Sequence, residues 1–191
     1  MALLKIATIG HPVLRDRARD VTPGELAGAS IQQLIDDMVA TMRDANGAGL
    51  AANQVHVPLR ICVIEVASNP RYSYLPSLPL TILVNPTLEP NSEESFLNFE
   101  GCLSVPNLRG QVPRFVGARI RALDRHGAPL DFVVRGLTAG TFQHELDHLE
   151  GTLFVDRVVD TRTLCTWTEF ERFHREEFTR RASDLVARFG S

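Results

Sequence analysis

"QHELDHLEG", residues 143–151, is the stretch that decides the fold, because it places two histidines one helical turn apart. Successive residues of an α-helix turn by about 100°, so His148 lies only roughly 40° around the axis from His144. By the same geometry three apolar residues gather on the opposite side of the helix: Phe142, Leu146 and Leu149. We therefore expect a helix that buries one face in the core and presents both imidazoles on the other.

The spacing of these two histidines also indicates chemistry. Imidazoles at positions i and i+4 can bind one cation, and a carboxylate at the next position, Glu145, can take a proton from water activated there. A solvated polar face is the alternative interpretation, and it would suffice for a lone histidine. At average composition, HExxH arises by chance in on the order of one in a few hundred chains of this size. The motif therefore predicts a metal site.

HExxH leaves a third protein ligand to be found. In HExxH endopeptidases it lies downstream, but no HxxGxxH continuation follows here, and the downstream acids Glu169 and Glu171 fall on a charged helix face. Upstream, "FEGCLSVPNLRG" (99–110) places Cys102 in what the pattern predicts to be an irregular loop. A thiolate there would complete a His2Cys site with one open position. The alternative, a buried apolar cysteine, suits Cys62 and Cys165 better.

A third constellation is "GAGLAANQV" (47–55), in which small residues precede Gln54. Small residues let the backbone approach a ligand closely, and the Gln54 amide can donate to a developing oxyanion. A simple helix cap is the alternative interpretation, so this motif gains weight only beside the other two.

The length, net charge and cysteine content limit the classes of protein to which this chain can belong. A chain of 191 residues with a net charge of −3 can form one domain, and it carries no global charge that would attract DNA or an anionic membrane. It contains no apolar run long enough to cross a membrane, and "MALLKIATIG" is too short for a signal sequence. Three widely spaced cysteines favour a reducing compartment, so we expect a cytoplasmic protein.

Hydrophobic periodicity predicts one α+β domain over residues 1–191, because helices and strands alternate without a regular βαβ order. We expect an N-terminal helix over 31–42, strands in 59–66 and 81–89, a stiff proline-rich loop over 68–80 and a hairpin between 114 and 135 that turns at His126. Thr138 is the expected N-cap of the HExxH helix, and a C-terminal helix is expected over about 164–189.

The three motifs, in this order and at these spacings, resemble those of the peptide deformylases, and the resemblance runs from "HPVLRD" to about "LFVDRV". It implies antiparallel β-sheets wrapped around a central helix that carries HExxH, with an N-terminal and a C-terminal helix. It also implies a metal-dependent amide hydrolase that removes the formyl group from the N-terminal formyl-methionine of nascent peptides and releases formate. Its implied roles are metal ligand for Cys102, His144 and His148, and general base and acid for Glu145.

The resemblance implies further site residues. Gln54 and the backbone N–H of Leu103 match groups that stabilise the tetrahedral intermediate, and Gly49 matches a residue whose backbone pairs with the peptide. Glu100 and Arg109 match further substrate-site positions, expected to form a charged pair that braces the Cys102 loop. The remaining expected substrate contacts are Leu137, Gly140 and Thr141. Because Ala48, Gly140 and Thr141 stand where the family often has bulkier apolar residues, we expect a roomier or more polar methionine pocket.

The implied cofactor is one divalent ion. Members of the family typically use Fe²⁺ in the cell, and Zn²⁺, Ni²⁺ or Co²⁺ can occupy the site in purified protein. The thiolate and imidazole donors alone favour zinc. The implied partners are N-formyl-methionyl nascent peptides, without membrane or DNA. The mixed charges of the C-terminal stretch allow transient ribosome contact, although a solvated helix packed through Trp167 explains them as well. Two alternatives stay open: an HExxH endopeptidase with a downstream ligand, and a degenerate family member that has become a binding or structural protein.

Overall fold

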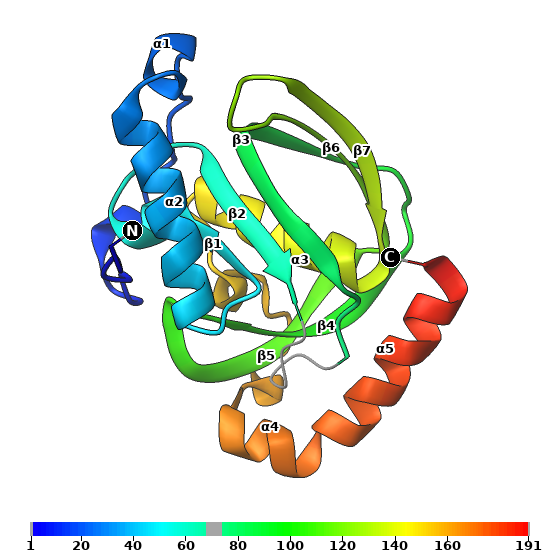
Figure 1. Cartoon of the computed structure of the whole chain (residues 1–191). Coiled ribbons are helices and arrows are strands. Elements are labelled where there is room, and N and C mark those ends of the chain that lie inside the picture. The colour runs from blue at the N-terminus through cyan, green and yellow to red at the C-terminus, as the bar shows by residue number, and fades with distance from the viewer. Residues whose placement is uncertain (1, 68–73, 191) are drawn as a thin grey trace.

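Helix α3 (Gly136–Leu149) runs through the middle of the molecule and is enclosed by two antiparallel sheets (Figure 1). The computed structural model describes residues 2–67 and 74–190. The other α-helices are α1 (Pro23–Leu26), α2 (Ala29–Asp44), α4 (Trp167–Phe173) and α5 (Arg175–Phe189). The strands are β1 (Gly49–Ala51), β2 (Ile61–Val66), β3 (Leu78–Pro90), β4 (Ser95–Cys102), β5 (Val105–Phe115), β6 (Gly117–Leu123), β7 (Pro129–Arg135) and β8 (Cys165–Thr166). The expected α+β class, with antiparallel sheets around the HExxH helix, is confirmed.

The larger sheet has the order β1-β2-β3-β6-β7 and separates α2 from α3. Side chains of β2 alternate between its faces: Ile61 and Val63 pack in the cluster of α2, whereas Cys62 and Ile64 pack in the cluster of α3. From α3 this second cluster receives the three residues predicted for the apolar side of the helix: Phe142, Leu146 and Leu149. Burial of that side fixes the direction in which the histidines point.

The smaller sheet consists of a long β4–β5 hairpin and β8, in the order β4-β5-β8. Its tip lies at the pair Cys102 and Val105, so Leu103 and Ser104 form a two-residue turn. The expectation of an irregular loop over 99–110 was therefore wrong. Glycines and charged residues interrupt the apolar alternation there, so the strand pattern is weak although the hydrogen-bonded ladder is continuous from Ser95 to Gly101. Cys102 consequently lies at the end of a strand.

The start of α3 also differs from expectation. β7 leads directly into the helix, Arg135 is the N-cap residue, and Gly136 turns the chain with a φ of +54°. Thr138 is buried inside the first turns rather than capping the helix. The β6–β7 hairpin is confirmed, with His126 exposed in the turn and its backbone N–H donating to the Asp124 carboxylate.

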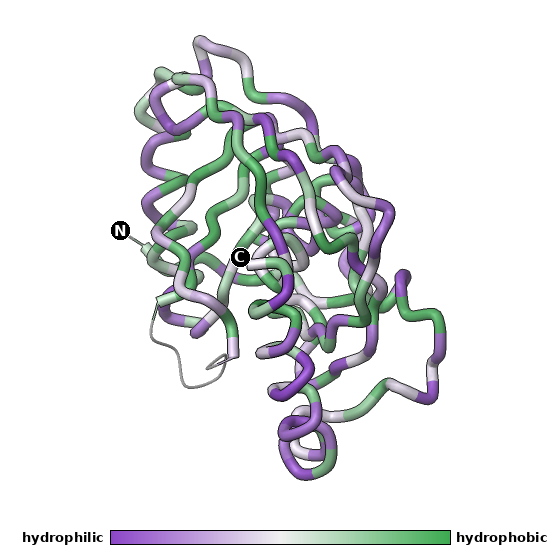
Figure 2. The backbone as a smooth tube through the Cα atoms, turned by 90° about the vertical axis from the view of Figure 1, so that its right-hand side faces the viewer, coloured by the Kyte–Doolittle hydropathy of each residue, from purple (hydrophilic) through white to green (hydrophobic). Residues whose placement is uncertain are grey.

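The expected C-terminal helix over 164–189 is instead β8 followed by two helices that meet at His174. The break lets Phe170 of α4 and Phe178 of α5 enter one apolar cluster with Phe99 of β4. Figure 2 shows hydrophobic residues along the central strands, whereas the C-terminal helices are mostly hydrophilic. Of the expected loop over 68–80, residues 68–73 lie outside the described residues and 78–80 belong to β3. Within the described ranges, no helix is both long and apolar enough to cross a membrane.

Candidate active site and metal centre

Three potential metal ligands converge where the β4–β5 hairpin meets α3. The ligand atoms of Cys102, His144 and His148 all lie within 4.8 Å of one another. Cys102 Sγ is 3.2 Å from His148 Nε2. A thiolate with two imidazoles is a donor set that zinc and other divalent transition metals accept, and three protein ligands leave a position for water or substrate. The residues present therefore fit a single divalent cation.

The charges around Cys102 favour the form that binds a metal. Burial raises the pKa of the Cys102 thiol, but His148 and His144 outweigh that effect and hold its pKa well below the ordinary value. Two donors also point at the sulfur: Gln54 Nε2 at 3.5 Å and the Ser104 backbone N–H at 3.4 Å. The thiolate is the form of cysteine that binds metals, so this environment favours Cys102 as a metal ligand.

Glu100 orients one of the histidines. Its Oε2 lies 2.9 Å from His144 Nδ1, which leaves Nε2 of that ring for a metal. Arg114 holds the same carboxylate with Nε to Oε1 at 2.7 Å and Nη2 to Oε2 at 2.8 Å. Arg114 also donates to Asp147 at 2.6 Å. Burial opposes ionisation of Glu100, but Arg114 and His144 together lower its pKa well below the ordinary range.

The expected pair between Glu100 and Arg109 was wrong. In the hairpin register Glu100 lies opposite Gly110, whereas Arg109 lies opposite Gly101. Neighbouring positions of a strand point to opposite faces, so the two side chains diverge, while Arg114 shares the face of Glu100. The charged partner that sequence reasoning missed could have been found from this two-residue alternation once the hairpin was recognised.

Glu145 lies beside the ligands with 5% of its surface exposed. Burial raises the pKa of its carboxyl group, and Oε2 has no hydrogen-bond partner among the described residues. Gly49 of β1 makes room for it, because a Cβ at position 49 would lie 2.4 Å from the carboxyl carbon. A buried carboxyl group with an uncommitted oxygen is suited to exchanging a proton with a bound molecule.

Gln54 is fixed by its own hydrogen bonds. Its Oε1 accepts from the Ala51 backbone N–H at 2.8 Å, and its Nε2 donates to Ser104 Oγ at 3.0 Å. The amide is thereby held beside Cys102, with Leu103 in the turn that follows. This places the donor predicted from the first motif next to the predicted ligands.

A cavity of about 70 Å³ opens beside these residues. Ala48, Gly140 and Thr141 line it, as does Arg109, whereas Leu137 lies outside it in the apolar cluster beneath α5. Three other lining residues lie outside the three motifs that predicted the site: Tyr74, Leu75 and Asn98. Asn98 lies two positions before Glu100 in β4 and donates to its Oε1 at 3.1 Å. The two-residue alternation of a strand would have predicted that Asn98 shares the face of Glu100.

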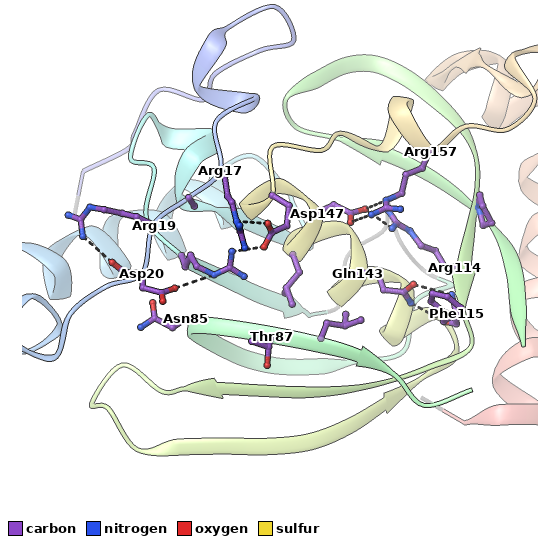
Figure 3. Close-up of a pocket in the computed structure, with 16 residues that line it drawn as sticks. Arg17, Arg19, Asp20, Asn85, Thr87, Arg114, Phe115, Gln143, Asp147 and Arg157 are labelled. Carbon is purple, nitrogen blue, oxygen red and sulfur yellow. Dashed lines mark hydrogen bonds and ion pairs between the residues drawn. The ribbon is translucent and has the colours of Figure 1, made fainter. Parts of the chain in front are cut away.

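A larger cavity, of about 830 Å³, lies on another face of α3 (Figure 3). Its three acids are already paired: Asp20 with Arg60, Asp147 with Arg114 and Arg157, and Glu150 with Arg17 and Arg60. No metal-ligand cluster lies among the residues that line it within the described part of the chain. This cavity therefore belongs to an ion-pair network behind the site.

The comparisons with known proteins agree with this geometry. The sequence profile of the polypeptide deformylase family matches residues 3–163. Peptide deformylase 2 of Nostoc sp. is 40% identical over 88% of this chain and 93% of its own, and peptide deformylase 2 of Ralstonia nicotianae is 47% identical over 82% of each. Among solved structures, the Met-Ala-Ser-bound class I type b peptide deformylase of Acinetobacter baumannii is 39% identical with a TM-score of 0.79, covering 82% of this chain and 99% of that one. The chain belongs to the peptide deformylase family.

Proposed function

We propose that this deformylase uses Cys102, His144 and His148 to hold one divalent cation and Glu145 to move the protons of the reaction. As a hydrolase of this family, the chain removes the N-formyl group from newly synthesised polypeptides. The observation that carries the assignment is the convergence of the three ligand atoms beside the uncommitted Glu145 Oε2. We place the whole of residues 1–191 in one catalytic domain and the protein in the cytoplasm.

The chemistry follows from the positions of the chain's own groups. A divalent cation at this site would supply Lewis acidity and would lower the pKa of water. Glu145 accepts the proton of the attacking water as the water adds to the formyl carbon, and it then delivers that proton to the departing amine. Gln54 Nε2 and the Leu103 backbone N–H donate to the oxygen that gains negative charge. The products are formate and a peptide with a free amino terminus.

The peptide backbone has a place to bind. Among the described strands β1 pairs with β2 alone and lies at the edge of the sheet, so the backbone of Gly49 can pair with an extended peptide in β-augmentation. The relative from Acinetobacter baumannii was solved with Met-Ala-Ser bound, which supports a short peptide as the ligand of this chain. The first side chain would then enter the cavity lined by Ala48, Gly140 and Thr141. We keep Leu137 as a residue that supports this cavity from behind.

For the cofactor we propose Fe²⁺ in the cell, with Zn²⁺, Ni²⁺ or Co²⁺ able to replace it in purified protein. The mixed thiolate and imidazole donors are compatible with all four ions. For partners we propose N-formyl-methionyl nascent peptides and a transient ribosome contact through the C-terminal helices. The rival endopeptidase assignment lacks support, because Glu169 is exposed and Glu171 is paired with Arg175.

The test is formate release from formyl-Met-Ala-Ser by protein loaded anaerobically with Fe²⁺ or with Zn²⁺. We expect rapid release with Fe²⁺, slower release with Zn²⁺, and loss of both activity and bound metal in Cys102→Ala. A Cys62→Ala variant is the control, because that buried thiol on β2 is not one of the three clustered ligands. Activity that survives Cys102→Ala would refute the assigned ligand set.

A further inference from the structure

The N-terminal segment, residues 2–9, connects two of the three motifs through its backbone. The Ala7 N–H donates to the Gln54 carbonyl at 2.7 Å, and the Ile9 N–H donates to the Ser104 carbonyl at 2.7 Å. Gln54 lies in the 3-10 helix Ala52–Val55, whereas Ser104 lies in the turn of the β4–β5 hairpin. The segment therefore joins the part of the chain that holds the Gln54 amide to the part that holds the Leu103 N–H.

These hydrogen bonds complete a closed ring. Gln54 Nε2 donates to Ser104 Oγ at 3.0 Å, so the two residues bound by the N-terminal segment are also bound to each other. In an extended chain, N–H groups two residues apart point to the same side and lie about 6.6 Å apart. Ala7 and Ile9 are two residues apart, and their N–H groups donate to these two linked partners. They therefore set the distance between the backbones of Gln54 and Ser104.

The chain is anchored on both sides of these bonds. Upstream, the Leu4 N–H donates to Thr41 Oγ1 of α2 at 2.9 Å. Downstream, the Ala18 N–H donates at 2.9 Å to the carbonyl of Leu149, the last residue of α3. Ala7 has only 2% of its surface exposed, so moving the segment would open the core around it. The groups that the segment binds are thereby placed relative to the helix that carries HExxH.

The N-terminal segment acts on the site from outside the cavity. Among the described residues, those that line the active-site cavity begin at Gly47 in the sequence. Residues 2–9 therefore lie behind the groups that meet a substrate. The carbonyls that they bind belong to Gln54 and to Ser104, which directly follows Leu103. Any influence of the segment on the reaction passes through these partners.

We propose that the backbone N–H groups of Ala7 and Ile9 position the two oxyanion donors, Gln54 Nε2 and the Leu103 N–H, at the separation that the reaction requires. This inference rests on the proposed function, which assigns these two donors to the oxygen that gains negative charge. Donors of this kind act mainly on the transition state. Disturbing their separation should therefore lower kcat and leave KM nearly unchanged.

Position 9 allows the N–H to be removed in two independent ways. The His11 N–H donates to the Thr8 carbonyl at 3.0 Å and Gly10 has a φ of +101°, so residues 8–11 form a type II turn with Ile9 in its second position. Proline is favoured there, so Ile9→Pro removes the donor, places a ring carbon against the Ser104 carbonyl and preserves the turn. The second variant replaces the Thr8–Ile9 amide by an ester, with the 2-hydroxy analogue of isoleucine, which keeps the side chain and adds no ring.

In metal-loaded full-length protein, both variants should lower kcat for formyl-Met-Ala-Ser about tenfold and keep KM within about twofold. Loss of an oxyanion donor costs about 100-fold or more, and a displaced donor keeps part of its effect. Ile9→Ala is the conservative variant, because it keeps the N–H and shortens a side chain that is 47% exposed, so kcat should return to the wild-type value. An ester at Ala7, made with lactic acid, should act in the same direction as the ester at position 9. In a Gln54→Ala background, Ile9→Pro should lower kcat by no more than about threefold.

A spectroscopic measurement tests the position of Gln54 without turnover. In protein loaded with diamagnetic Zn²⁺, the proton–nitrogen correlation signals of the Gln54 side-chain amide should shift in both variants that lack the Ile9 N–H and stay in place in Ile9→Ala. The side-chain amide of Gln143, which donates to the Phe115 carbonyl at 2.9 Å, is the internal reference and should not shift. Each variant should hold as much zinc as the wild type.

Three results would overturn the proposal: wild-type kcat in both variants that lack the N–H, a kcat for Ile9→Ala as low as that of Ile9→Pro, or loss of bound zinc in the ester variant. The last would mean that the segment supports the metal ligands and not the oxyanion donors. If Ile9→Pro failed to fold, the ester variant would decide alone. If the wild type released no formate while the Gln54 signals moved only in the variants without the N–H, the proposed function would fail and the positioning by the N-terminal segment would stand.

Discussion

The carboxyl group of Glu145 fills the space that a side chain at position 49 would require. A Cβ built on Gly49 would lie 2.4 Å from both the carboxyl carbon and Oε1 of Glu145. Gly49 is the first residue of β1, and Glu145 lies in α3, so a glycine of the first motif is sterically coupled to the acid of HExxH. This contact explains why small residues in the first motif matter for chemistry.

Gly49→Ala should therefore displace Glu145 and lower kcat by about 100-fold or more, since small misplacements of a catalytic group have effects of that size. Metal content should stay at the wild-type level, because the three atoms nearest to a Cβ at position 49 all belong to Glu145 and none to a ligand. The measurements are formate release and metal analysis of the same preparation. Gly24→Ala, where a Cβ would meet nothing within 4 Å, is the control. Wild-type kcat in Gly49→Ala would contradict the steric coupling.

Arg114→Met should destabilise the protein by about 3–5 kcal/mol, because it leaves two buried carboxylates, Glu100 and Asp147, without this partner. It should also weaken metal binding by about 10–100-fold, because Glu100 orients His144. Urea unfolding and metal titration measure the two effects. Arg119→Met removes an exposed ion pair with Asp131 and should leave both the urea midpoint and metal binding close to those of the wild type. Similar losses in both variants would argue against the buried network.

Much of this site follows from three short motifs, because HExxH fixes its own geometry once a helix forms and its apolar face is buried. The partners of those motifs were harder to find. Glu100 pairs with Arg114 and not with Arg109. Which arginine becomes the partner depends on strand register, and register is set by contacts between segments that are distant in sequence. The break at His174 likewise depends on how Phe170 and Phe178 fit beneath β4, which helical periodicity alone does not encode.

Glu25→Gln should destabilise the start of the N-terminal helices in a pH-dependent way. A hydrogen bond from Arg19, followed by bonds from Thr22, lowers the pKa of Glu25 from 4.5 to about 2 in the folded protein. A lowered folded-state pKa adds stability above the unfolded value, and this stability is lost as pH falls toward the folded value. The difference in urea midpoint between wild type and variant should therefore be full at pH 7 and should narrow as the pH falls below about 4.5. A difference that grows on acidification would contradict this.

The active-site cavity lined by Ala48, Gly140 and Thr141 should accept a polar side chain on the first residue of the peptide better than a purely apolar pocket would. Asn98 and Thr141 line it, and a Cβ on Gly140 would lie 3.1 Å from Asn98 Nδ2 and 3.3 Å from the Phe96 ring. Asn98→Leu should therefore lower kcat/KM for formyl-glutaminyl peptides by about fivefold relative to formyl-norleucyl peptides, since buried amides discriminate through hydrogen bonds. An unchanged ratio between the two substrates would show that Asn98 does not face the bound side chain.

The central claim is that Glu145 moves protons at a metal held by Cys102, His144 and His148. Its most direct test is formate release from formyl-Met-Ala-Ser by wild type and Glu145→Gln, with the metal content of each preparation measured alongside. We predict one bound metal ion in both proteins, rapid release by the wild type, and a rate at least about 1,000-fold lower in the variant. Comparable formate release by Glu145→Gln at full metal occupancy would contradict the account.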